Sequence, residues 1–231
     1  MNSAHDDVEA LLIQAEIDAE RIVALTRMVA AAGLLVIFVI VIAPQSDVTN
    51  LAVMQRQMTY ALGTILAYFV LGLGAWIATR RGVFRRWMIW PTAAADAAFT
   101  VASVWAGMQN TGLTGDTAFA LPPVWLIPLV LAYGVIRVNP RIMAMIAVIL
   151  LVGFGFLISV EAGTKYGQDQ HRVWLFLSLP PNLIRLGMIA MAAAVLVMAA
   201  RRTQALLRQS IDVAVTNTNL TRFLPQQLAP R

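Results

Sequence analysis

Long apolar segments alternate with short polar stretches along most of this 231-residue chain. A helix that crosses about 30 Å of hydrocarbon needs roughly 20 mainly apolar residues. Several segments approach or reach that length, and the stretches between them are too short to hold folded domains. The pattern therefore predicts an all-α integral membrane protein with six transmembrane helices. These segments cover approximately residues 28–43, 59–79, 88–108, 121–138, 142–160 and 173–200.

A polar segment, residues 1–27, precedes the first of these helices. It does not resemble a signal peptide, because acids stand where a positively charged start would be and no apolar run follows directly. Its early acids suit the N-terminus of a helix. Val8, Ala15 and Ile22 recur every seven residues and form a modest apolar stripe. We predict a cytoplasmic helix whose stripe could pack beside the helix that follows the last span, or across a dimer.

The last apolar segment continues into residues 201–224, with no proline before Pro225. Leu206, Val213 and Leu220 recur every seven residues, a weak form of the heptad pattern of coiled coils. We predict a signalling helix that meets a second copy of the chain; a plain juxtamembrane helix is the alternative. The residues expected to transmit a signal are Arg201, Arg202, Leu206, Leu207, Ile211, Val213, Leu220, Arg222 and Phe223.

Composition agrees with a membrane protein. Hydrophobic residues make up 59% of the chain and charged residues 13%, whereas soluble domains have about 45–50% and about 25%. There is no cysteine, which excludes disulfides and thiolate metal sites. A lipid bilayer is therefore the expected surrounding, and we expect no nucleic-acid partner.

The distribution of arginine predicts the orientation in the membrane. Arginines cluster in residues 80–86, in residues 137–141 and after residue 200, which share one side if both termini lie there. Positively charged residues collect on the cytoplasmic side of membrane proteins. We therefore predict a multi-pass protein of the inner (plasma) membrane with both termini in the cytoplasm.

Two charged residues, Asp96 and Arg185, fall inside predicted spans. Such residues are costly in a bilayer and usually face the interior of a helix bundle. They form a candidate pair that either senses a ligand or holds the bundle together. Polar residues of the outer loops could also bind a small molecule, a lipid or a protein. These candidates are Asp47, Asp116, Glu161, Lys165, Asp169, His171 and Arg172.

The end of the chain carries a family resemblance. The stretch "NLTRFLPQQLAPR" resembles the junction between the signalling helix and the catalytic domain in bacterial class III adenylate and guanylate cyclases. The six-span layout is similar to the membrane anchors of mycobacterial-type membrane cyclases. The matching residues are Asn219, Leu220, Thr221, Arg222, Phe223, Leu224, Pro225 and Leu228.

The resemblance implies the membrane anchor and regulatory domain of a homodimeric cyclase, an enzyme of the lyase class that converts ATP to cyclic AMP and pyrophosphate. Residues 225–231 would begin the junction to a catalytic domain, which we expect to follow Arg231. That domain would use Mg or Mn with ATP. The chain itself would not be catalytic, and no catalytic, cofactor-binding or metal-binding residue is predicted in it.

Other functions fit the same layout. The membrane domain could serve a diguanylate cyclase or a histidine kinase, or it could be a passive anchor. A small transporter is a further alternative, because prolines interrupt two of the predicted spans and broken helices can form binding sites within membranes.

Overall fold

The computed structural model describes residues 2–42, 51–111, 114–160 and 179–223, and within these ranges it contains helices and no strands. The predicted all-helical fold is therefore confirmed for the described residues. The described ranges hold six α-helices and three 3-10 helices (η), in this order: α1 Asn2–Ile42, α2 Leu51–Arg80, η1 Arg86–Met88, α3 Ile89–Thr111, η2 Gly115–Ala120, η3 Pro122–Leu126, α4 Ile127–Ile136, α5 Pro140–Ser159 and α7 Leu179–Phe223.

Four of the described helices are long and apolar enough to cross a membrane. These membrane-spanning stretches are Ile13–Ile40, Met58–Arg80, Pro140–Ser159 and Pro181–Ile211. They correspond to the first, second, fifth and sixth predicted spans, so the protein belongs to a membrane. The boundary predicted at residue 27 does not interrupt α1, which continues from the polar segment into the apolar one.

The third and fourth predicted spans differ from this group. The third is helix α3, which has 23 residues, but Thr, Ser and Asp side chains interrupt its apolar residues, and it has no stretch as apolar as those four. The fourth begins with the 3-10 helix η3 at two prolines, and with α4 it forms only the shorter apolar helix Pro122–Ile136. Proline is tolerated at the start of a helix because the amide hydrogen that it lacks would have no partner there, but it is excluded from the interior of an α-helix.

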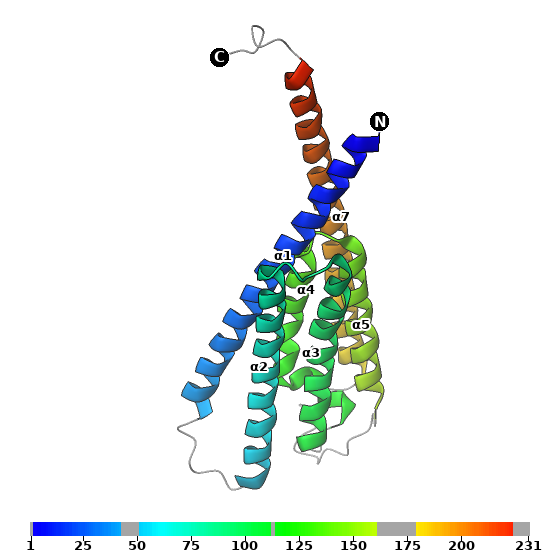
Figure 1. Ribbon diagram of the computed structural model, residues 1–231. Helices are drawn as coiled ribbons and strands as arrows, with labels where there is room; N and C mark the ends of the chain where they lie inside the picture. The colour runs from blue at the N-terminus through cyan, green and yellow to red at the C-terminus, as the bar shows by residue number, and fades with distance from the viewer. Residues whose placement is uncertain (1, 43–50, 112–113, 161–178, 224–231) are drawn as a thin grey trace.

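The helices form a bundle whose polar extensions project from one end (Figure 1). Helix α1 packs along α2, α3 lies against α5, and α5 lies against α7. Near the end from which they project, α1 also contacts α7. The loop between α2 and α3 and the turn between α4 and α5 lie at this same end (Figure 1). We call it the arginine end, because Arg80, Arg86 and Arg137 lie there.

The core lies between α3, α4 and α5, where Val104, Ile146, Leu150 and Phe154 are fully buried. The outer helices leave much of their apolar surface exposed. On α1, Ile40 is 67% exposed, and on α7, Met191 is 65% exposed. This arrangement suits a bilayer. Lipid tails are as apolar as these side chains, so contact with lipid carries no hydrophobic penalty.

The packed face of α1 includes charged residues that its apolar stripe does not contain. Glu20 and Arg27 are completely buried, whereas Ile22 of the stripe is 55% exposed. Ile22 therefore does not pack within this copy of the chain, and packing of the stripe across a dimer stays a prediction. Where the surroundings are apolar, charged side chains turn inward to reach partners, and apolar ones can face outward.

Candidate functional site

The most deeply buried polar feature of the described residues is a group of ion pairs at the arginine end of the bundle. Arg27 of α1 binds Asp96 of α3 through two parallel hydrogen bonds: Nε donates to Oδ1 and Nη2 donates to Oδ2, each at 2.7 Å. Both side chains are completely shielded from solvent. Such two-point pairs between arginine and a carboxylate are among the strong and geometrically specific hydrogen bonds of proteins.

A second arginine, Arg137, binds the same aspartate and a glutamate of α1. Arg137, which follows α4, donates from Nε to Oε2 of Glu20 at 2.7 Å and from Nη2 to Oδ2 of Asp96 at 2.9 Å. Glu20 in turn lies 3.1 Å from Nη1 of Arg27. Each arginine therefore contacts both carboxylates, and we call these four residues, Glu20, Arg27, Asp96 and Arg137, the ion cluster.

A second ion pair involves Glu16, which lies one helical turn before Glu20 on α1. Glu16 accepts a hydrogen bond from Nε of Arg86 at 2.7 Å and another from the Asn139 amide at 3.1 Å. Arg86 is half exposed, with 47% of its side chain accessible. This outer pair is therefore partly solvated, and it contributes less to stability than the buried pairs.

Local structure explains how these side chains meet. Glu16, Glu20 and Arg27 are separated by four and seven residues, which places them on one face of an α-helix. Arg137 and Asn139 flank Val138, whose φ of 52° lies in the left-handed region. That conformation is rare for a branched residue such as valine. It makes the turn between α4 and α5 tight enough to present Arg137 and Asn139 to the same helix.

The charges of the ion cluster balance. Two arginines face two carboxylates, all four side chains are buried, and every carboxylate oxygen contacts a guanidinium group. A closed and neutral group of this kind has no free acid or base for catalysis. It instead fastens α1 to α3 and to the turn between α4 and α5, which supports the structural interpretation of Asp96.

The structure does not form the predicted pair of Asp96 and Arg185. Asp96 is bound by Arg27 and Arg137, and Nη1 of Arg185 donates to Oδ1 of Asn182 one turn earlier in α7. The two residues lie toward opposite ends of the bundle, because α3 begins and α7 ends at the arginine end (Figure 1). The pairing is therefore corrected: both residues have partners, but not each other.

The predicted outer-loop site is only partly described. Asp116 lies in η2 and is 4% exposed, so it belongs to the packed interior of this loop. Its backbone carbonyl accepts a hydrogen bond of 2.7 Å from the Asn182 side chain of α7. The remaining candidates lie outside the described residues: Asp47, Glu161, Lys165, Asp169, His171 and Arg172.

The predicted signal-transmission residues all lie on α7. Arg201, Arg202, Leu206 and Val213 are exposed, whereas Leu207 and Ile211 are half-buried. The side chains of the other three, Leu220, Arg222 and Phe223, are outside the described part of the structure.

Sequence reasoning identified Asp96 but missed its partners. Arg27 and Arg137 looked like boundary arginines that set the orientation, and Glu20 looked like part of a solvated helix. The signal that could have found them is the shared helix face of Glu16, Glu20 and Arg27 at the start of an apolar segment. In the described ranges, no group of three or more histidines, cysteines, aspartates or glutamates could hold a metal ion.

Comparisons of the chain with protein-family models, curated proteins and solved structures find no match.

Proposed function

We propose that this chain is the membrane anchor and regulatory domain of a class III adenylate cyclase, acting as a homodimer in the inner membrane with both termini in the cytoplasm. The observation that carries the proposal is the continuity of α7. This helix runs without a break from Leu179 to Phe223. It thus joins a membrane-spanning stretch directly to the residues that resemble the cyclase junction.

The length of α7 fits a transmitting role. At about 1.5 Å per residue, its 45 residues extend roughly 67 Å, about twice the thickness of the hydrocarbon layer. The helix is therefore long enough to span the bilayer and continue beyond it, and its C-terminal part projects beyond the rest of the bundle (Figure 1). On that projecting part, Leu206 and Val213 are 55% and 54% exposed. These two residues lie on the same face and are free to pack against a second α7.

The proposed mechanism is a change in how two α7 helices pair. A ligand, lipid or partner that alters the packing of the bundle would change the rotation or spacing of the two helices. The fraction of dimers with aligned catalytic domains would change accordingly. The ion cluster supports a mechanism in which α7 moves relative to the other helices. It links α1, α3 and the turn after α4, and it includes no residue of α7.

Cysteine crosslinking tests the dimer. The chain has no cysteine of its own, so each single variant carries one reactive thiol. We expect Leu206→Cys and Val213→Cys to form disulfide-linked dimers in membranes, because paired helices bring such positions to the Cα separation of about 5.5 Å that a disulfide needs. Crosslinked dimers are measured on non-reducing gels.

Arg208→Cys is the matched control. Arg208 is also exposed, but it lies about 200° around the helix from Leu206 at 100° per residue. It should crosslink several-fold less than the two test positions. Equal crosslinking at all three positions would mean that no face of α7 is the dimer interface.

Sequencing of the complete gene tests the proposed output. The proposal requires that the gene also encode a domain with the paired metal-binding aspartates of class III cyclases. A diguanylate cyclase domain or a kinase histidine helix would contradict the cyclase assignment while leaving the dimeric helix in place.

A further inference from the structure

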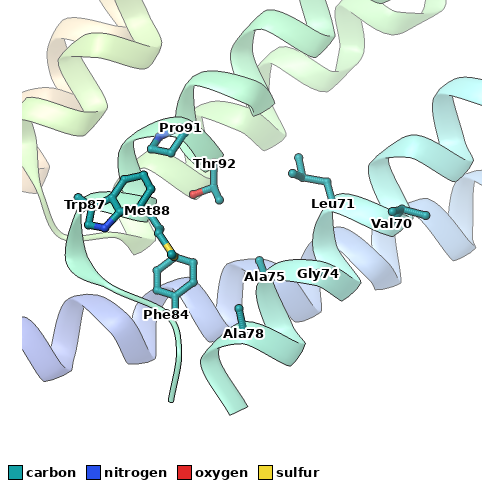
Figure 2. A pocket seen from close by; sticks show the side chains of 10 residues that line it. All are labelled: Val70, Leu71, Gly74, Ala75, Ala78, Phe84, Trp87, Met88, Pro91 and Thr92. Atoms are coloured by element: carbon teal, nitrogen blue, oxygen red, sulfur yellow. The ribbon is translucent and has the colours of Figure 1, made fainter. Parts of the chain in front are cut away.

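An apolar groove opens on the side of the bundle near the arginine end. One wall is α2, which contributes Val70, Gly74 and Ala78, and the other is the segment from Phe84 through η1 to the start of α3 (Figure 2). The volume of the groove is about 450 Å³, within the range of about 300–1,000 Å³ typical of small-molecule sites. Its lining is almost entirely apolar, and Trp87 at its edge is 62% exposed.

The loop that joins the two walls of the groove carries arginines. The loop from Arg81 to Arg85 folds back on α2, because the amides of Val83 and Phe84 both donate to the carbonyl of Ala78 at 3.1 and 3.2 Å. Phe84 is thereby buried against the groove, and Arg85 follows it directly in the chain. The side chains of Arg81 and Arg85 are exposed. Among the described residues, neither pairs with a carboxylate.

The groove also adjoins the end of the apolar stretch of α2. The membrane-spanning stretch of α2 ends at Arg80, whose guanidinium lies 4.4 Å from the centre of the Trp76 ring. Tryptophan and arginine are typical of the boundary between hydrocarbon and headgroups. An apolar cavity on the hydrocarbon side thus adjoins unpaired positive charge on the headgroup side.

We infer that the groove is a binding site for an anionic phospholipid, with an acyl chain between α2 and α3 and the phosphate headgroup beside Arg81 and Arg85. The positive charges of Arg81 and Arg85 favour an anionic lipid over other occupants of the groove. A zwitterionic lipid would fill the apolar part equally well, but its headgroup charge does not complement two free arginines. A second copy of the chain would bring its own arginine loop into the same place if it docked symmetrically, and like charges would repel. The inference does not depend on which output domain α7 serves.

Lipid titration of the purified full chain, read by native mass spectrometry, tests the site. The delipidated protein is titrated with phosphatidylglycerol and, separately, with phosphatidylcholine, and the bound lipids are counted. We expect a preference for phosphatidylglycerol. The double variant Arg81→Gln/Arg85→Gln should reduce that preference about 30-fold, since a basic side chain near an anionic surface contributes about fivefold in affinity. The double variant Arg141→Gln/Arg208→Gln removes the same charge from other exposed positions and should keep the preference.

A glycine pair on α2 supplies a matched test of the apolar half. Neither Gly63 nor Gly74 has another atom within 4 Å of where a Cβ would lie, so both positions accept a side chain without a clash. Only Gly74 lines the groove (Figure 2). Gly74→Leu should therefore weaken binding of phosphatidylglycerol several-fold, and Gly63→Leu should leave it unchanged.

Three results would overturn the inference. The first is equal binding of the two lipids by the unaltered protein. The second is a preference for phosphatidylglycerol that survives Arg81→Gln/Arg85→Gln. The third is a dimer mass that disappears only in Gly74→Leu, which would show that another copy of the chain occupies the groove.

Discussion

Asp96→Asn is expected to lower the free energy of unfolding by about 3–5 kcal/mol, the usual cost of removing one partner from a buried ion pair. The substitution keeps the size of the side chain but removes its charge. Arg27 and Arg137 would then share the single carboxylate of Glu20 in a region with no solvent access. The asparagine amide group would also turn a donor toward one of the guanidinium groups, which have no acceptor to offer.

Thermal or denaturant unfolding of the protein in mild detergent measures this effect. Asp18→Asn is the control, because it makes the same chemical change on an exposed side chain of α1 whose described partner is Gln14. It should alter stability by no more than about 0.5 kcal/mol. An Asp96→Asn protein as stable as the Asp18→Asn protein would contradict the structural role of the ion cluster.

A double-mutant cycle separates a connected cluster from independent pairs. Arg27→Gln alone should also destabilise the protein, because it leaves two carboxylates facing one arginine. The double variant Arg27→Gln/Asp96→Asn restores the charge balance and keeps the pair of Arg137 and Glu20. Its loss of stability should therefore be smaller than the sum of the single losses by about 0.5–3 kcal/mol, the range found for residues in one network. Strict additivity would show that the two side chains do not interact.

The helices of this protein could be predicted from the sequence because a span needs only a sufficient run of apolar residues. Four such runs became long apolar helices. The run that contains Pro122 and Pro123 did not, and the reason is local: proline is excluded from the interior of an α-helix, so α4 begins only after these prolines and is short. The prediction counted apolar residues and underestimated this restriction.

The partners of Asp96 could not be predicted in the same way. Helix periodicity places Glu20 and Arg27 on one face, but it does not say which face of which other helix meets them. That depends on how α1 crosses α3 and on the turn at Val138, where a left-handed backbone conformation aims Arg137 inward. Arg185 was a reasonable guess for a partner from its place inside a span. The bundle, however, puts it near the end opposite to Asp96.

The burial of the outer loop could not be predicted from the sequence either. The sequence predicts that Asp116 belongs to a ligand-binding outer rim, because it lies in a loop between two predicted spans. In the structure, four consecutive residues of η2, from Gly115 to Ala118, are buried. Close backbone approach explains this, and the residue that permits the approach is a glycine that composition alone does not distinguish from the others.

Gly115→Ala is expected to destabilise the protein by about 1–3 kcal/mol, the range for an overpacked core. A Cβ at this position would lie against the carbonyl oxygen of Leu157 and 2.7 Å from that of Val160. Both are backbone atoms at the end of α5, so neither can rotate away as a side chain would. The amide of Gly115 also donates to the Val160 carbonyl at 3.1 Å, and moving η2 to relieve the clash would lengthen this hydrogen bond.

The effect should reach α7, because the Asn182 side chain holds η2 through the carbonyl of Asp116. Gly187→Ala is the control: a Cβ there meets nothing within 4 Å, and replacing a glycine inside a helix with alanine stabilises it by roughly 0.5–1 kcal/mol. The two substitutions add the same methyl group but should shift the unfolding midpoint in opposite directions. If Gly115→Ala were as stable as the unaltered protein, η2 would not be packed on the end of α5, and the contact through which it supports α7 would be absent.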